Sequence, residues 1–336
     1  MNPLFAPSFS LFSAVGGTYL GQSIALAVAV SWTVCALLSE TVSRRLGAHV
    51  VNVLRMVLSL LFIGALLWGC TGSPLPPRAD ATTWGWLLAS GLVGYVFGDY
   101  CLFNAYLLIG SRFGQLFMTI APAVSAVAGW LLLGEQLSAQ ALAGMAVTMT
   151  GIAVSILGRG APDEEGEGRR RRKVRLNLPT RGVLLGIGAG VGQGLGLTLS
   201  AVGLKHYAAV WTVAKVGTST VFLLPFAATQ MRAVAGLPGF LLLLFLAGKG
   251  DALRRACTDG RGWLLMAATV VFGPFVGVSL SLMATQYTST GVAMTIMSLS
   301  PVLILWPAHV LFGQRVTRRE GLGARLSVAG VALFFV

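Results

Sequence analysis

Charged side chains are scarce in this sequence. Only 10% of its 336 residues are Asp, Glu, Lys or Arg, and the whole chain contains just 11 acids and 3 histidines. A soluble globular domain has about 25% charged residues, and disordered chains are also rich in charge. The scarcity therefore excludes an ordinary cytosolic enzyme and a disordered protein.

Cysteine is equally sparse, and neither cysteine nor histidine follows a ligand spacing. The four cysteines are Cys35, Cys70, Cys101 and Cys257, and no two of them form a Cys-x-x-Cys pair. The histidines also lie far apart in the chain. Disulfide scaffolds and metal sites need closely patterned ligands. We therefore predict no disulfide framework, no metal site and no cofactor.

Apolar residues and glycine are abundant instead. Hydrophobic residues make up 55% of the chain, the mean hydropathy is +0.79, and there are 43 glycines. Because a helix needs about 20 apolar residues to cross a bilayer, the sequence indicates an all-α membrane protein whose helices pack closely at glycine. Residues 237–247 are apolar but too short to span, and we expect them to be interfacial or re-entrant. The ten predicted spans are 20–38, 50–69, 84–108, 113–133, 139–157, 182–204, 208–230, 262–284, 289–312 and 321–336.

Basic residues lie mainly in the gaps between these spans. The formal net charge is +13, and the densest basic cluster belongs to the polar segment 158–181. Lys and Arg concentrate on the cytoplasmic side of membrane proteins. We therefore interpret 158–181 as a charged cytoplasmic linker of a multi-pass protein in the cell (inner) membrane, and expect no nucleic-acid partner. The same distribution places both termini outside the cell.

The second half of the chain repeats the first. A shift of 179 residues aligns 94–153 with 273–332 without a gap and superimposes five pairs of glycines. We predict two repeats of five helices, 20–157 and 182–336. An odd number of spans inverts the second repeat relative to the first, which is typical of alternating-access transporters. The alternative is a duplicated helical bundle with no transport role.

A set of glycines, prolines and polar residues marks both repeats. They are Pro122, Gly134-Glu135-Gln136-Leu137, Gln140, Gly144 and Gly151 in the first, and Pro301, Gly313-Gln314, Gly323 and Gly330 in the second, with Ser31-Trp32 and Arg55 in the first two spans. Together they resemble the EamA-type repeat of the drug/metabolite transporter superfamily. The resemblance implies export of amino acids or similar metabolites, and termini inside the cell, opposite to the charge distribution. Gln314 stands where that family usually has glutamate.

Three charged residues fall inside the predicted spans, where a charge is costly and usually functional. They are Asp99, Arg55 and Lys215. Asp99 shares a helix face with Tyr95 and Tyr106, and we expect that face to line a cavity. Asp99 would then act as a proton-coupling acid or as a ligand for an amine. The alternative is a structural ion pair with Arg55.

The two buried bases are predicted at comparable depths in equivalent helices. Trp211 shares the face of Lys215, and Arg55 lies in the second span. Inverted symmetry would place the two cations on opposite sides of a central cavity, where they would attract an anionic or zwitterionic substrate such as a carboxylate. The alternative is that both side chains snorkel toward the membrane surface. Pro122 and Pro301 are predicted mid-span, where each would remove a helical hydrogen bond and serve as a gate hinge or shape the bundle.

These features favour a transporter over an enzyme. The sequence contains no Gly-x-x-x-x-Gly-Lys-Ser/Thr motif for ATP, so we predict a secondary exporter of small organic metabolites, coupled to protons through Asp99. The alternatives are an uptake carrier, a facilitator or a channel, and an intramembrane lipid-modifying enzyme. The expected partners are a small-molecule substrate and the lipid bilayer, and the sequence leaves the oligomeric state open.

Overall fold

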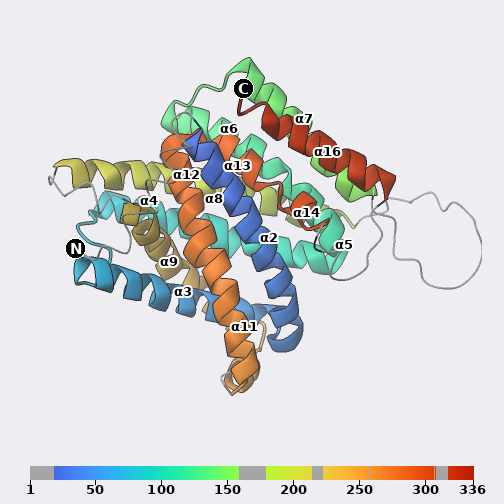
Figure 1. Ribbon diagram of the computed structural model, residues 1–336. Coiled ribbons are helices and arrows are strands. Elements are labelled where there is room, and N and C mark those ends of the chain that lie inside the picture. The colour runs from blue at the N-terminus through green and yellow to red at the C-terminus, as the bar shows by residue number, and fades with distance from the viewer. Residues whose placement is uncertain (1–18, 159–178, 214–221, 257, 306, 308–316) are drawn as a thin grey trace, which may run out of the picture.

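The structure is a computed structural model in which helices account for the ordered secondary structure (Figure 1). It describes residues 19–158, 179–213, 222–256, 258–305, 307 and 317–336, and no β-strand occurs among them. Two of the helices, η2 and η4, are π-helices. In chain order the helices are α2 (Leu20–Leu46), α3 (Ala48–Thr71), α4 (Ala81–Gly91), η2 (Leu92–Asp99), α5 (Tyr100–Met118), α6 (Ile120–Leu133), α7 (Ala139–Gly158), α8 (Thr180–Val213), α9 (Leu224–Leu246), α10 (Gly250–Ala256), α11 (Gly260–Val270), η4 (Val271–Val278), α12 (Ser279–Tyr287), α13 (Thr290–Met297), α14 (Ser300–Leu303) and α16 (Arg318–Ala332).

Seven stretches of helix in the described part of the chain are long and apolar enough to cross a membrane. This agrees with the predicted all-α membrane fold, whereas the number ten stays a prediction. The linker predicted at 158–181 lies almost wholly outside the described residues. The seven stretches are Leu20–Ser43, His49–Thr71, Leu116–Leu133, Ala139–Leu157, Thr180–Val210, Leu224–Leu246 and Gly260–Tyr287.

The two halves contain equivalent secondary structure. Helix α4, the π-helix η2 and the start of α5 recur 179 residues later as α11, η4 and the start of α12. Asp80 and Asp259 precede α4 and α11, and each carboxylate accepts a hydrogen bond from the backbone N–H three residues on, at 3.0 and 3.1 Å. Such caps satisfy amide groups that have no partner within the helix. The sequence repeat therefore corresponds to a structural repeat of the same period.

The equivalent helices α7 and α16 run antiparallel. Helices α7 and α16 lie side by side (Figure 1). A Cβ atom added to Gly151 would lie 2.8 Å from the carbonyl oxygen of Gly323, and one added to Gly144 would lie 3.0 Å from that of Gly330. These contacts are reciprocal, as a twofold relationship requires. An axis that reverses the direction of a helix lies across it, so the two halves have opposite orientations along these helices.

The first helix of each half packs against the opposite half. Helix α8 lies along α4, η2, α5 and α6, whereas α2 lies along α11, η4, α12 and α13. Gly192 and Gly196 of α8 meet Gly98 and Gly94 of η2, and the missing side chains let the two backbones approach closely. The expected packing at glycine is therefore confirmed. Helices α3 and α9, the second helices of the two halves, also pack against each other.

The structure corrects the predicted ends of two helices in the second half. Helix α8 continues through the gap predicted between 182–204 and 208–230. The interfacial or re-entrant assignment of 237–247 is wrong, because all but the last of these residues belong to α9. Phe240 and Leu244 of α9 are buried in a core cluster with α3. The sequence is apolar almost continuously here, so tertiary packing rather than local hydropathy determines where each helix begins.

Both prolines predicted as mid-span hinges instead begin helical segments. Pro122 lies in the first turn of α6, after a break at Thr119, and Pro301 lies in the first turn of α14, after a break at Ser298 and Leu299. Helix α5 continues through the loop predicted between spans 84–108 and 113–133. The helix break therefore lies closer to Pro122 than the sequence predicts. Amide groups of a first turn have no partner within the helix, so neither proline removes a hydrogen bond. Their role as hinges stays a prediction.

Candidate functional site

Asp99 is buried at the end of the π-helix η2, where both halves meet. Its exposure is 8%. Arg55 of α3 donates from Nη2 to Asp99 Oδ2 at 2.6 Å, and Gln193 of α8 donates from Nε2 to Asp99 Oδ1 at 2.8 Å. Each half thus supplies one donor to the carboxylate. The ion pair with Arg55, one of the two alternatives that the sequence left open, is present, and proton coupling by Asp99 stays a prediction.

Gln193 also contacts the backbone of the π-helix. Its Nε2 lies 3.2 Å from the carbonyl oxygen of Gly94. A π-helix bonds residues five apart, which changes the pattern of backbone pairing, and such segments are frequent at functional sites. The equivalent helix η4 has a similar contact, because Ser31 Oγ of α2 donates to the carbonyl oxygen of Phe272 at 2.7 Å. Each π-helix is therefore bound by a polar side chain from the first helix of the opposite half.

A second buried arginine belongs to the same site. Arg232 of α9 is 5% exposed, and its guanidinium carbon lies 4.6 Å from the centroid of the Tyr95 ring. None of the acids in the described part of the chain lies within ion-pair distance of Arg232. Asp99, Arg55, Gln193, Tyr95 and Arg232 are named the Asp99 cluster below. With two guanidinium groups and one carboxylate, the cluster carries a net positive charge.

Sequence reasoning missed Arg232. The predicted span ended at residue 230, so Arg232 was assigned to a loop, whereas α9 contains it. Arg232 follows Arg55 by 177 residues, two short of the repeat period, and α9 is the second helix of its half as α3 is of the other. This near match to the repeat period is the sequence feature that could have identified Arg232 as a site residue. Lys215, which the sequence predicts for that role, lies outside the described residues.

Of the other predicted site residues, Tyr95 has a described side chain, whereas Tyr106 and Trp211 are described only by their helices. Tyr95 lies in η2, is 7% exposed and contacts Arg232. Tyr106 lies in α5, and Trp211 lies near the end of α8. The side chains of Tyr106 and Trp211 fall outside the described part of the structure. Of the two tyrosines predicted to flank Asp99, only Tyr95 can therefore be assigned to the cluster.

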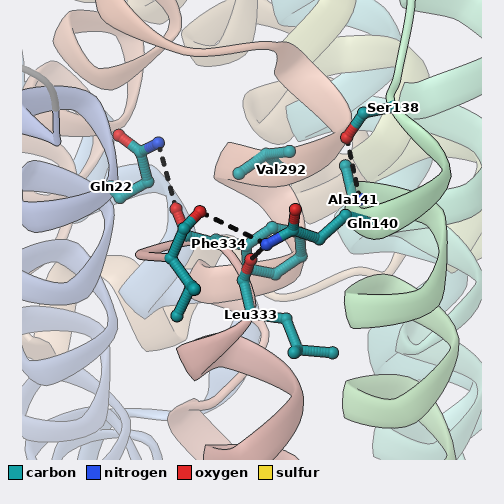
Figure 2. A pocket seen from close by; sticks show the side chains of 8 residues that line it. Gln22, Ser138, Gln140, Ala141, Val292, Leu333 and Phe334 are labelled. Carbon is teal, nitrogen blue, oxygen red and sulfur yellow. Dashed lines mark hydrogen bonds between the residues drawn. The ribbon is translucent and has the colours of Figure 1, made fainter.

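A separate pocket of about 180 Å³ lies near the end of α16. Figure 2 shows Gln22 and Gln140 pointing toward the backbone of this helix end. Gln140 Nε2 donates to the carbonyl oxygen of Leu333 at 2.9 Å, and Gln22 Nε2 lies 3.5 Å from that of Phe334. These amides satisfy carbonyl groups that a helix end leaves unpaired. The residues that line the pocket are Gln22, Ser138, Gln140, Ala141, Val292, Leu333, Phe334 and Val336.

The fold and the site together define a class of protein. The chain has several helices that can cross a membrane, two equivalent halves whose helices α7 and α16 run antiparallel, and a buried group of charges to which both halves contribute. In the residues that the structure describes, no three His, Cys, Asp or Glu side chains gather as they would around a metal ion. These features define a multi-pass helical membrane protein built from a repeat.

The chain belongs to the EamA-like transporter family, which its sequence matches twice, over residues 19–157 and 180–336. The resemblance inferred from the sequence is thus confirmed, and the protein is a membrane transporter by family. The two matched regions together cover most of the chain.

Known proteins similar to this chain include the following two. One is the probable 4-amino-4-deoxy-L-arabinose-phosphoundecaprenol flippase subunit ArnE of Pectobacterium atrosepticum, which is 38% identical over 72 residues. The match covers 21% of this chain and 61% of that protein, less than two thirds of its length. The other is a protein of known crystal structure, with a TM-score of 0.63 and 17% identity over 94% of this chain and 96% of that chain. Similarity at this identity establishes a shared fold alone.

Proposed function

We propose that the protein is a secondary active transporter of the cell membrane that exports small organic metabolites such as amino acids. Transport proceeds by alternating access between two inverted repeats and is coupled to protons. Membership of a transporter family supports the general class. The antiparallel arrangement of equivalent helices supports the mechanism, because inverted repeats around a midplane site are the usual architecture for alternating access.

The position of Asp99 is the observation that carries the proposal. Its carboxylate is bound by Arg55 from one half and by Gln193 from the other. A proton on Asp99 removes the negative charge, and a buried arginine without its carboxylate is strongly unfavourable. Proton binding therefore changes the energy of contacts among α3, η2 and α8. A ligand that favours one arrangement of these contacts shifts the population between conformations.

Transport by purified protein in liposomes tests the proposal. Labelled amino acids and amines are offered under an imposed pH gradient, and accumulation is compared between wild type, Asp99→Asn and Asp80→Asn. Asp80 is a matched control, because it is a carboxylate at a helix N-terminus away from the cluster. Asp99→Asn should abolish accumulation driven by the gradient while it retains solute exchange, and Asp80→Asn should retain both.

Two results would contradict this function. If no offered solute moves under a pH gradient, the chain is not a proton-coupled carrier of these compounds. If Asp99→Asn accumulates solute as well as wild type does, Asp99 does not carry the coupling proton. Exchange without any response to pH would favour a facilitator.

A carrier of lipid-linked sugars is a second candidate. The relationship to ArnE, whose name denotes a flippase subunit for a phosphoundecaprenol-linked amino sugar, supports it. Liposomes that contain a fluorescent polyprenyl-phosphate sugar test this candidate, because reduction of the fluorophore from outside measures how much lipid has crossed. Flipping of that lipid together with no movement of amino acids would favour the second candidate.

The ten-span topology belongs to the same proposal. The charge distribution favours termini outside the cell, whereas the family resemblance favours termini inside. Single cysteines introduced near residues 20 and 318, in a variant without the native cysteines, can be tested with a membrane-impermeant maleimide in intact cells. Residue 318 precedes the last predicted span, so the two positions are expected on opposite sides of the membrane. Labelling near residue 20 with protection near residue 318 supports the charge distribution, and the reverse supports the family resemblance.

A further inference from the structure

We propose that Arg232 and Tyr95 bind an oxyanion, the carboxylate or phosphate group of the transported solute. The inference rests on the proposed function, because it takes the Asp99 cluster as the substrate site. It names a chemical class of substrate, and it identifies two residues that recognise that class.

Arg232 is buried, and no acid in the described part of the chain forms a direct ion pair with it. Arg55 has a carboxylate at 2.6 Å, whereas Arg232 has none within ion-pair distance among the described residues. Removing an unpaired charge from water costs several kcal/mol or more. Asp99 acts on Arg232 only at longer range and already accepts hydrogen bonds from Arg55 and Gln193. A buried guanidinium that no carboxylate contacts directly therefore favours recognition of an anionic ligand. Arginine suits that role because its fork matches carboxylate and phosphate geometry.

Several hydrogen-bond donors around η2 have no partner among the described residues. The Nε atoms of Arg55 and Arg232 and the Oη atom of Tyr95 are buried and have no hydrogen-bond partner in the described part of the chain. Tyr95 interacts electrostatically with both arginines, so the three groups belong to one neighbourhood. Each can donate, and the arginines cannot accept. The two arginine Nε–H groups can be satisfied only by an acceptor, which an oxyanion supplies and a protonated amine does not.

Arg232 is held by an aromatic ring and by close backbone packing. The Tyr95 ring lies against its guanidinium, whose Nε–H has no hydrogen-bond partner among the described residues. A Cβ atom added to Gly94 would lie 3.1 Å from Arg232 Nη2, and one added to Gly91 would lie 3.1 Å from Arg232 Cα. Gly91 of α4 and Gly94 of η2 therefore leave room for the arginine. Its position is fixed before a ligand binds, which lowers the entropy lost on binding.

Ligand-dependent thermal stability of the purified full-length protein tests the inference. The probes are benzoate and its neutral analogue benzamide, which have nearly the same shape, and inorganic phosphate, all at constant ionic strength. We expect benzoate or phosphate to raise Tm in wild type and benzamide to leave it unchanged. A response to benzoate alone assigns a carboxylate, and a response to phosphate alone assigns a phosphoryl group.

Three variants separate binding from general charge effects. Arg232→Gln should weaken the apparent affinity for the anion about tenfold or more, since it removes a charged hydrogen-bond donor. Tyr95→Phe keeps the aromatic ring against Arg232 and should weaken the affinity for the anion less. This variant also keeps the test decisive if Arg232→Gln does not fold. Arg319→Gln removes one exposed positive charge from α16 and should behave as wild type.

The inference is overturned if no anion stabilises wild type, or if the anion stabilises Arg232→Gln as strongly as wild type. If Arg232→Gln does not fold, equal stabilisation of Tyr95→Phe and wild type overturns it. Because the readout is binding, it does not depend on proton coupling. Anion binding that is lost in Arg232→Gln, combined with no transport under a pH gradient, would support this site while it contradicted the proposed mechanism.

Discussion

Asp80 and Asp259 occupy the same position in the two halves, yet only Asp259 forms an ion pair among the described residues. Arg45 of α2 donates from Nη2 to Asp259 Oδ1 at 2.7 Å and from Nε to the other carboxylate oxygen. Both aspartates cap equivalent helices, and the ion pair ties α2 to the start of α11. Between α8 and the start of α4, the described residues show only a longer-range electrostatic interaction of His206 with Asp80. The two halves therefore have similar helices but differ in the side-chain contact at the start of α4 and α11.

Acid should weaken this contact. The hydrogen bonds that Arg45 donates hold the pKa of the Asp259 carboxyl below its ordinary value. A carboxyl with a lowered pKa contributes stability that is present above its unfolded-state pKa and is lost as the pH falls through the folded one. Thermal unfolding between roughly pH 6 and pH 2 should therefore show a steeper loss of Tm in wild type than in Asp259→Asn. Asparagine preserves the helix cap, so the change isolates the charge.

Asp80→Asn is the control for the acid experiment. The hydrogen bonds from Thr83 also lower the pKa of the Asp80 carboxyl, but no arginine is paired with it among the described residues. The Asp259 effect should shrink at about 1 M salt, because exposed charges are screened. An equal response of the two variants to both acid and salt would mean that Arg45 contributes nothing.

Substitution of Gly323 should destabilise the contact between α7 and α16. A Cβ atom there would lie 2.6 Å from the carbonyl oxygen of Gly151, so the helices must separate. We expect Gly323→Ala to cost about 1–3 kcal/mol, measured as a fall in Tm in detergent. Gly321 of the same helix has open space around it, and Gly321→Ala should be neutral or slightly stabilising, because alanine favours helix. Equal effects of the two changes would contradict the close crossing.

Removal of the Glu135 side chain should loosen the second half from the first. Glu135 Oε2 accepts hydrogen bonds from the backbone N–H of Thr290 at 2.9 Å and from its hydroxyl at 2.8 Å, which caps α13. We expect Glu135→Ala to cost about 1 kcal/mol, as other lost caps do, and Glu135→Gln to cost less. Exposed Gln136→Ala is the control. A Glu135→Ala variant as stable as this control would exclude a capping role.

The pair formed by Arg55 and Asp99 should show strong energetic coupling. Arg55→Gln and Asp99→Asn each leave a buried charge without its partner, and each should cost about 3–5 kcal/mol. The double variant removes both charges and should cost less than the sum of the two, with a coupling of about 1–3 kcal/mol. The same cycle for the exposed pair of Arg45 and Asp259 should give a much smaller coupling. Additive effects at Arg55 and Asp99 would contradict a direct interaction.

Several features of the site could be predicted because they depend on local composition. Asp99 and Arg55 stand out in apolar surroundings, and the glycine pattern predicts where backbones approach. Gln193 and Arg232 could not be assigned their partners in this way. Gln193 lies 94 residues from Asp99 along the chain, and the contact arises only when α8 crosses into the opposite half. Local hydropathy does not predict which helices of the opposite half a helix will contact.

The sequence by itself determined that the chain is a membrane protein of the EamA-like type with a 179-residue repeat, because apolar length and periodic glycines are properties of the linear chain. Only the tertiary structure decided that Arg232 lies in a helix and contacts Tyr95. The apolar region from residue 208 to 247 is longer than one span. Several alternative positions of the helix ends would therefore bury a similar apolar surface area there. Packing against α3 selects one of them, and that choice puts a second positive charge beside Asp99.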